Sequence, residues 1–433
     1  GNLEEGRLPM TIYPFHLSNI HERSMSAYVA RATPFIIFVS AIFLSVTFAF
    51  QSRYKLLVLA SIFNVWMWLY LVSYALSTIR ATRMTMRAMV SVEGYLSTSR
   101  SSEDLLPVNG GETPGKVEVV HLIILPNYKE DESILAATLE ALSQAHGSHS
   151  FRIVLAMEER EGKSVTKNKA AKLQDRFGRS FADICAALHP LDLEELHLDG
   201  SSDTEVPGKS SNLKWAVSAG RKRCVSAGLD LADVVLTVAD ADCIFHPGYF
   251  AEIGKEFREL RRMASARIIG GQSSRHPWVI WQAPQLPFRN YFASLVPARL
   301  WGYVATVIEF GGVGGLAHAG LHMTFSSFSL PLSLVIEASP WDGDVIADDH
   351  HCYLKCFLYS IYQQACEHSK NSHLHRNGLN PPLVVRPIML PVKSTSVVAD
   401  NCVSSWLARF EQAKRHAQGV AEFSYILLGV FKM

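Results

Sequence analysis

Two aspartates, Asp240 and Asp242, directly follow an apolar, β-branched run at residues 234–239. An uncharged run of this kind predicts a buried strand, and a His-Pro-Gly sequence at 246–248 ends the element. Residues two apart in an extended chain project to the same side. Two carboxylates at the carboxyl end of a strand, where open α/β sheets bind ligands, suit Mg²⁺ or Mn²⁺. The alternative is an ordinary acidic turn.

A second pair of carboxylates, Asp348 and Asp349, ends the sequence Trp-Asp-Gly-Asp-Val-Ile-Ala-Asp-Asp at residues 341–349. A positioned carboxylate can accept the proton of an attacking hydroxyl group. Adjacent carboxylates can raise the pKa of one of the two, which suits a base. The alternative is the N-terminus of a helix, where the helix dipole favours acidic residues.

A Gly-Lys-Ser sequence at residues 208–210 invites comparison with the phosphate-binding loop of nucleotide hydrolases. That loop needs a glycine five residues before Gly208, where this chain has Asp203, and a strand leading into it, whereas residues 200–206 are polar. We therefore do not expect such a loop. Lys209 at a helix start is still a suitable place for a phosphate group. A solvated basic helix start is the alternative.

The elements that must position these residues alternate between strand and helix. Apolar runs at 117–125 and 151–157 predict strands, and a further strand is possible at 193–198. Helices are expected from Ser133, at 164–188 and at 212–225. This alternation predicts an α/β fold, with a mostly parallel sheet and helices on both faces. The acids then gather at strand ends, which favours a nucleotide and metal site (Glu130, Glu158, Asp240, Asp242).

Composition narrows the classes of function. The chain has 433 residues, with 41 Lys and Arg against 40 Asp and Glu, and its net charge of +1 gives no global field that favours nucleic acid. Seven cysteines without a framework spacing fit a reducing compartment. The cluster at 350–356 lacks a second ligand pair at zinc-finger spacing, so structural zinc is not expected.

Two apolar runs, at residues 33–50 and 56–79, are each long enough to cross a hydrocarbon core of about 30 Å. Each could be a buried soluble helix, but only a short loop separates them, which favours a transmembrane hairpin. Basic residues precede and follow the pair (Arg23, Arg31, Arg80, Arg83, Arg87). By the positive-inside rule, both ends of the hairpin face the cytosol, so we expect a multi-pass integral membrane protein with a cytosolic catalytic domain.

These patterns divide the chain into five parts. We expect a cytosolic segment at 1–32, the hairpin at 33–79, a linker at 80–116, a catalytic domain at 117–400 and an amphipathic interface helix from 401 onward. The aromatic, proline-containing stretch 279–310 suits helices packed under the membrane or lining an acceptor path, and the alternative is a plain hydrophobic core. Residues 423–431 look like the start of another membrane segment, and the chain begins without Met, so we expect a membrane region to be missing after 433.

Five motifs, in this order, resemble those of the membrane-bound glycosyltransferases of family 2, which include cellulose, chitin and hyaluronan synthases and related single-sugar transferases. They are Leu-Pro-Asn-Tyr-Lys-Glu at 125–130, Gly-Lys-Ser-Ser-Asn-Leu at 208–213, Asp-Ala-Asp at 240–242, Ala-Asp-Asp at 347–349 and Gln-Ala-Lys-Arg-His at 412–416. The resemblance covers about residues 117–418 and implies the GT-A type of α/β fold.

The resemblance also implies roles on the donor side of a site. The turn with Pro126, Tyr128 and Glu130 would hold base and ribose, together with Glu158, although the family has an Asp-Asp pair at that last place. Lys209 would face the diphosphate. Asp240 and Asp242 would engage the nucleotide and the divalent ion, Mg²⁺ or Mn²⁺.

On the acceptor side, the resemblance makes Asp349 the general base and Asp348 its neighbour. Gln412, Arg415 and His416 share one helix face, and with Trp341 they would form the acceptor and diphosphate end. The family has Trp where this chain has His416. That departure argues against sugar stacking there and against a standard cellulose or hyaluronan synthase.

The resemblance, together with the apolar hairpin, therefore implies a membrane-anchored inverting glycosyltransferase. It would move a sugar from a nucleotide-sugar donor, expected to be UDP-linked, to a carbohydrate or lipid acceptor near the bilayer. One alternative is a single transfer to a lipid acceptor such as a polyprenyl phosphate or ceramide. Another is a non-catalytic, membrane-held scaffold that retains the fold.

Overall fold

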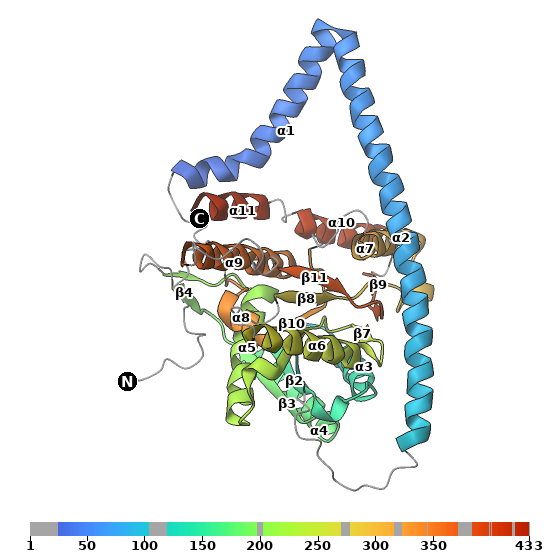
Figure 1. Ribbon diagram of the computed structural model, residues 1–433, viewed down its shortest axis with the longest axis vertical. Helices are drawn as coiled ribbons and strands as arrows, with labels where there is room; N and C mark the ends of the chain where they lie inside the picture. The colour runs from blue at the N-terminus through green and yellow to red at the C-terminus, as the bar shows by residue number, and fades with distance from the viewer. Residues whose placement is uncertain are drawn as a thin grey trace.

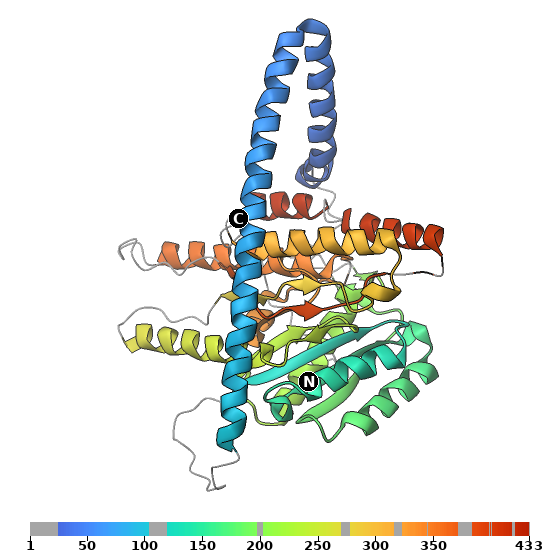
Figure 2. The same cartoon turned by 90° about the vertical axis from the view of Figure 1, so that its right-hand side faces the viewer.

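The computed structural model describes residues 25–103, 119–196, 202–269, 278–315, 323–343, 345–370, 383–397, 399, 401–417 and 421–432. Two long helices, α1 (Met25–Gln51) and α2 (Arg53–Glu103), form a hairpin that projects from an α/β domain (Figure 1). The second half of α2 runs down the side of that domain (Figure 2).

The hairpin has the length and apolar surface that the sequence predicts. Two helical segments, Tyr28–Gln51 and Arg53–Val92, are long and apolar enough to cross a membrane, and the most apolar stretch of each is not buried. Helix α2 continues to Glu103, within the segment 80–116 that the sequence analysis assigns to a linker. The position of the hairpin in a bilayer stays a prediction.

The central sheet confirms the predicted α/β class. Its strand order is β11-β8-β10-β6-β1-β2-β3. β10 is antiparallel to both of its neighbours, and the other pairs in this sheet are parallel. The strands are β1 (Val120–Asn127), β2 (Arg152–Glu158), β3 (Asp183–His189), β6 (Val234–Val238), β8 (Val279–Gln282), β10 (Phe328–Pro331) and β11 (Val384–Pro387).

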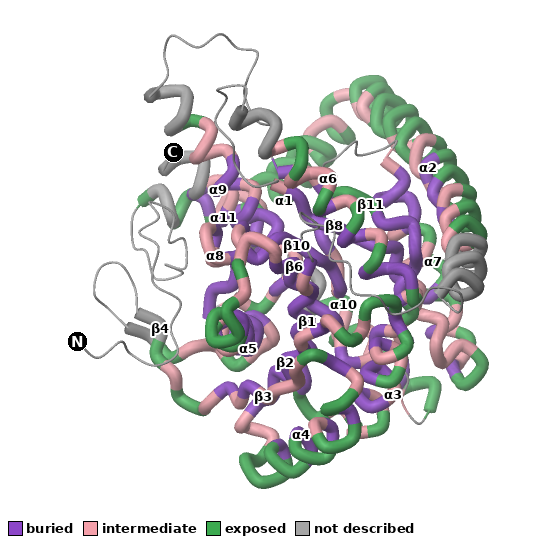
Figure 3. Tube along the Cα trace, turned by 60° about the horizontal axis from the view of Figure 1, so that its bottom comes forward, coloured by how far each residue is buried: buried purple, intermediate pink, exposed green. Residues whose placement is uncertain are grey.

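Helices cover both faces of this sheet. Successive residues of each strand point to opposite faces, and apolar residues on both faces are buried under these helices. In β1, Leu122 and Ile124 pack in one apolar cluster with α5 (Lys209–Ser226), α8 (Leu332–Ala338) and α9 (Asp348–Lys370). Ile123 and Leu125 pack in the other cluster with α3 (Glu132–Ser143), α4 (Lys163–Phe177) and α6 (Tyr249–Ile269). The strands are accordingly the most continuously buried part of the domain (Figure 3).

The structure corrects the predicted helix 164–188. Helix α4 ends at Phe177, and Asp183–His189 forms β3, which pairs in parallel with β2. Phe181 and Ile184 are therefore not on that helix. The apolar residues 184–188 suit either element by composition, and pairing with the edge of β2 decides for the strand.

Three further element boundaries differ from the predictions. The N-cap of α3 is Asp131, and Ser133 lies inside the helix. The possible strand at 193–198 is β4 (Glu194–Leu196), which pairs with β5 (Ser202–Thr204) outside the main sheet. The amphipathic helix expected from residue 401 onward is two helices, α10 (Cys402–Ala417) and α11 (Ala421–Lys432).

A layer of helices lies between the hairpin and the sheet, formed by α7 (Val296–Val313), α10 and α11 (Figures 1 and 2). The Ser77 hydroxyl of α2 donates to the Gly311 carbonyl of α7 over 2.7 Å. A Cβ on Gly311 would lie 2.0 Å from the Tyr74 ring, so glycine permits this close approach. Ala30 of α1 shares an apolar cluster with Tyr425 and Leu428 of α11. A small sheet of β7 (Ile244–Phe245), β12 (Val392–Lys393) and β9 (Gln285–Leu286) supports this layer.

Candidate active site

The carboxyl ends of the parallel strands bring several polar residues to one edge of the sheet. β1 leads into Tyr128 and Glu130, β2 ends at Glu158, β3 ends at His189, and β6 leads into Asp240. These strands are parallel and adjacent, so the residues that follow them must meet there.

Lys209 joins three elements at this edge. Its ammonium group lies 2.7 Å from Asp240 Oδ1 and 2.9 Å from Asp348 Oδ2. The start of α5, the end of β6 and the start of α9 therefore meet at one cation. Burial lowers the pKa of Lys209, but Asp240, Asp348 and Asp349 outweigh that effect and hold its pKa well above the usual value. Lys209 is charged in this setting.

Asp349 is held by the loop that precedes β10. The Ser326 N–H donates to Asp349 Oδ2 over 3.0 Å, and the His350 N–H donates to Oδ1 over 2.8 Å. The Ser326 hydroxyl also donates to Asp240 Oδ2, so one residue links the two carboxylates. Ser326 has φ of 49°, a left-handed conformation that is costly for a non-glycine residue and is found often at functional sites.

Burial is the largest influence on the pKa of both neighbouring carboxyl groups, Asp348 and Asp349, but the two pKa values shift in opposite directions. At Asp348, burial and the charges of Asp349 and Asp240 outweigh the attraction of Lys209 and raise the pKa to about 7. At Asp349, burial is offset by His350, Lys209 and the two backbone donors, so its pKa lies below the usual value. Asp349 is thus ionised at neutral pH, which leaves it free to accept a proton, while Asp348 titrates near neutrality. The raised pKa that the sequence analysis expects of a base therefore falls on Asp348 and not on Asp349.

Asp242 faces a different partner from Asp240. Its carboxylate accepts hydrogen bonds from Thr395, from the N–H over 2.7 Å and also from the hydroxyl group. The Arg289 guanidinium donates to the Asp242 carbonyl over 2.8 Å. Thr395 thus ties the segment after β12 to the end of β6.

The carboxylates suit a divalent ion only in combination with a substrate. Within the described residues, no group of three or more His, Cys, Asp or Glu side chains is arranged to hold a metal ion. Mg²⁺ sites commonly use one or two carboxylates together with water and substrate phosphates. Asp240 and Asp242 stay the predicted ligands of such a site; in the structure, Asp240 contacts Lys209 and Ser326, whereas Asp242 contacts Thr395.

The turn after β1 is built around Glu130. Its Oε2 accepts from the Tyr128 N–H over 2.6 Å and from Asn127 Nδ2 over 2.8 Å. Burial raises the pKa of Glu130, against the hydrogen bond from Tyr128. The Arg160 guanidinium lies 3.9 Å from the centre of the Tyr128 ring, a cation–π contact. Pro126 lies just before the turn, within β1.

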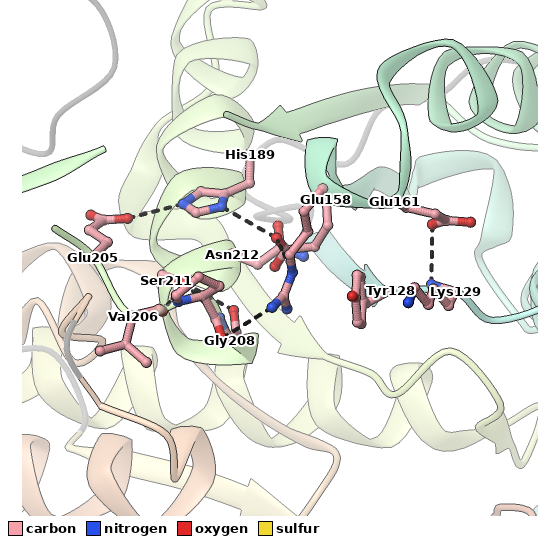
Figure 4. A network of polar contacts seen from close by, with 12 residues as sticks. Tyr128, Lys129, Glu158, Glu161, His189, Glu205, Val206, Gly208, Ser211 and Asn212 are labelled. Atoms are coloured by element: carbon pink, nitrogen blue, oxygen red, sulfur yellow. Dashed lines mark hydrogen bonds and ion pairs between the residues drawn. The ribbon is translucent and has the colours of Figure 1, made fainter. Parts of the chain in front are cut away.

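Glu158 belongs to a buried network at the ends of β2 and β3 (Figure 4). It lies 3.2 Å from Arg160 Nε and 3.6 Å from His189 Nδ1, and His189 Nε2 lies 3.0 Å from Glu205. Burial lowers the pKa of His189, but Glu158 and Glu205 outweigh it and raise the pKa to about 9. The sequence analysis missed His189 because it placed residues 164–188 in a helix. The available signal for His189 was the apolar run 184–188, which has the length of a strand and ends at this polar residue.

A second buried network joins the start of α9 to α11. Asp342 Oδ2 lies 2.9 Å from His351 Nε2, and His351 Nδ1 lies 3.1 Å from Glu422 of α11. Lys355 also donates to Asp342, whose carbonyl accepts from the Ser210 hydroxyl over 2.7 Å. Burial lowers the pKa of His351, but its two carboxylate partners outweigh it and raise the pKa to about 9. The network ties the elements that carry Lys209 and Asp349 to the helix layer.

The structure says less about the expected acceptor residues. Trp341 is 2% exposed, and its indole N–H has no partner within the described part of the chain. Gln412 Oε1 accepts from Arg409 Nη1 over 2.5 Å. Arg415 and His416 lie in α10, but their side chains are outside the described residues. Lys209, Asp240, Asp348 and Asp349 are brought together, whereas a common site with Gln412 stays a prediction.

Comparisons with known proteins give little beyond this geometry. No protein-family model matches the chain, and no curated protein matches it. Among solved structures, the chain is similar to a mannosyltransferase from Pyrobaculum calidifontis in complex with GDP-Man and Mn²⁺, with 13% identity and a TM-score of 0.37. The match covers 82% of this chain and 80% of that one. The substrate and ion of that protein do not follow for this chain from a likeness of this size.

Proposed function

We propose that this chain is a membrane-anchored, metal-dependent, inverting glycosyltransferase that uses a nucleotide-sugar donor. The observation that carries the proposal is the meeting of Lys209 with Asp240 and Asp348 at 2.7 and 2.9 Å. Asp349 adjoins them through Ser326. These residues come from motifs far apart in the sequence, and the family resemblance gives each of those motifs a place in one active site.

The donor would lie across the carboxyl edge of the sheet. Tyr128, Glu130 and Glu158 would surround base and ribose, and Lys209 would face the diphosphate. Asp240 and Asp242 would hold Mg²⁺ or Mn²⁺, which when bound offsets the charge that develops on the leaving diphosphate. Lys209 is neutralised by two carboxylates here, so donor phosphates would exchange places with one of them.

The transfer needs a proton acceptor on the acceptor side. The acceptor oxygen forms a bond to the anomeric carbon as the bond to the diphosphate oxygen breaks, and the bonding electron pair leaves with the nucleoside diphosphate. The hydroxyl proton passes to Asp349. Asp349 suits this role because it is ionised and its orientation is fixed by the Ser326 and His350 N–H groups. Attack opposite the leaving group inverts the anomeric centre.

A lipid acceptor is the second candidate, favoured by the helix layer. Leu300 and Trp301 of α7 and Trp406 and Phe410 of α10 are exposed, from 43% to 64%. These helices lie next to the base of the hairpin (Figure 2). Exposed aromatic and aliphatic residues on such helices suit the boundary between headgroups and acyl chains.

The proposal is tested with the full chain in membranes, using labelled nucleotide sugars with Mg²⁺ or Mn²⁺. We expect release of nucleoside diphosphate from one donor, loss of release on chelation, and recovery when the ion is restored. Turnover that survives chelation would contradict metal dependence. Absence of turnover with every nucleotide sugar would favour the non-catalytic scaffold. Lipid-extractable product, as opposed to released or insoluble polymer, would identify single transfer.

A further inference from the structure

Glu309 is a carboxyl group in α7 for which the proposed mechanism has no role. The residue keeps some exposure, but its Oε2 atom is shut off from solvent and has no hydrogen-bond partner within the described residues. The backbone N–H of Gln285, in β9, donates to the same carboxyl group. A buried polar atom without a partner is costly, so such an atom beside a proposed site calls for a ligand.

Gln285 presents a second atom of this kind. Its side-chain nitrogen donates to the Ser327 carbonyl over 3.3 Å and to the Ala283 carbonyl over 3.4 Å. Its side-chain oxygen, Oε1, is shut off from solvent and has no donor within the described residues. Glu309 and Gln285 are in contact through the backbone N–H, so the two unsatisfied oxygens belong to residues that touch each other.

That region adjoins the proposed general base. Gln285 contacts Ser327, and the preceding residue, Ser326, donates its N–H to Asp349. The titratable groups that face Glu309 are Asp349 from α9 and Tyr74 from α2. Burial, followed by the charge of Asp349, raises the pKa of Glu309 to about 8. Glu309 therefore keeps its proton at neutral pH and can donate through a carboxyl O–H, while Gln285 Oε1 can only accept.

We propose that Glu309 and Gln285 bind a neutral hydroxyl group of the acceptor beside Asp349. This inference rests on the proposed function and specifies its acceptor class. A hydroxyl group can accept from Glu309 and donate to Gln285 at once, which satisfies both oxygens. A doubly ionised phosphate group has no proton to offer Gln285, and it would add negative charge beside the carboxylate of Asp349, which faces Glu309. A sugar or sphingolipid hydroxyl thus fits, and a polyprenyl phosphate does not.

The test compares acceptors and variants in the detergent-solubilised full chain, with the donor found in the screen. The acceptor probes are ceramide, decyl glucoside and undecaprenyl phosphate. Donor hydrolysis without acceptor and the acceptor KM are measured for wild type, Glu309→Leu and Glu309→Gln. Glu411→Leu is the matched control, because Glu411 is an exposed carboxylate on α10.

We expect transfer to ceramide or decyl glucoside and not to undecaprenyl phosphate. Glu309→Leu should raise the acceptor KM by about 10-fold, the effect of losing one buried hydrogen bond, and should lower donor hydrolysis by less than this. Glu309→Gln should restore the KM, because its amide is neutral and donates as the protonated carboxyl does. The wild-type KM should rise above about pH 8 as Glu309 ionises, and that of Glu309→Gln should not.

Three results would overturn the inference alone, in a protein that does turn over a donor. They are an acceptor KM unaffected by Glu309→Leu, an equal loss of hydrolysis and transfer in that variant, and product formed only on undecaprenyl phosphate. A wild-type protein that neither hydrolyses nor transfers any nucleotide sugar would overturn the proposed function, and the inference with it. Infrared spectra give a readout without turnover, since the band of a protonated carboxyl should be lost in Glu309→Gln at neutral pH.

Discussion

At the scale of single residues, His189 and His351 are two buried histidines near this site that carboxylate partners hold in the charged form. Each imidazole is buried between two carboxylates, and each pKa is raised to about 9. A histidine whose pKa rises on folding stabilises the fold fully below its unfolded pKa, near 6.5. That stabilisation is lost as the pH rises through about 9. Both networks therefore weaken in the same alkaline range.

We predict that the thermal unfolding midpoint falls between pH 6.5 and 9 and that His189→Gln makes this fall smaller. The part due to His351 should remain in the variant. His149→Gln is the control, because His149 is exposed. Intrinsic fluorescence of the solubilised protein measures the midpoint. Identical pH dependence in His189→Gln and wild type would show that this network does not hold a charged histidine.

Site residues could be predicted from the sequence where they stand in short, recognisable motifs. Lys209, Asp240, Asp348 and Asp349 stand in short motifs, and the structure places Lys209 against Asp240 and Asp348. Ser326 and Thr395 could not be found in that way. Their contacts with Asp349, Asp240 and Asp242 depend on how β10 and β12 pair, and no spacing in the sequence marks serine or threonine for such a role.

Among the elements, α11 links the hairpin to the site. It packs against α1 through Tyr425 and Leu428 and contacts α9 through the ion pair of Glu422 with His351. His351 lies two residues after Asp349. The position of α11 should therefore influence the general base without any contact with substrate.

We predict that Glu422→Gln lowers stability and slows transfer while donor affinity is kept. Removing one partner of a buried ion pair costs about 3–5 kcal/mol, and the loss should loosen the first turn of α9. Hydrogen exchange of that turn, together with kcat and donor KM, measures the effect. Glu411→Gln on α10 is the control, since Glu411 forms an exposed pair with Lys414. Unchanged exchange and unchanged kcat in Glu422→Gln would contradict this role.

The type of an element could be predicted where the apolar pattern extends over many residues. It was predicted wrongly where the apolar run is short. The strands before Glu130, Glu158 and Asp240 were predicted, because β-branched and apolar runs lead into polar turns. Residues 184–188 were assigned to a helix because the run is too short for its period to decide. The break between α10 and α11 was missed because the apolar pattern continues across it.

At the scale of the whole molecule, the hairpin, the helix layer and the sheet edge form a sequence of layers (Figure 1). The two apolar helices are not buried along their most apolar stretches, as expected of surfaces that meet lipid. The layer of α7, α10 and α11 lies between them and the site. An acceptor from the bilayer would thus reach Asp349 past α7, the helix that carries Glu309.

We predict that the hairpin loop and the helix layer lie on opposite sides of the membrane. In sealed spheroplasts of an expression host, Ser52→Cys should react at once with a membrane-impermeant maleimide, because Ser52 lies between α1 and α2. The native Cys402, exposed at the start of α10, should react only after permeabilisation. Labelling of both sites in intact spheroplasts would contradict a cytosolic site.

The central claim, that these carboxylates form one sugar-transfer site, is tested most directly by single-turnover transfer in Asp349→Asn. Nucleotide binding is measured on the same preparation. We predict that transfer slows by about 10²–10⁴-fold, the usual contribution of a general base, while nucleotide affinity is unchanged. Transfer at the wild-type rate by Asp349→Asn would contradict the account.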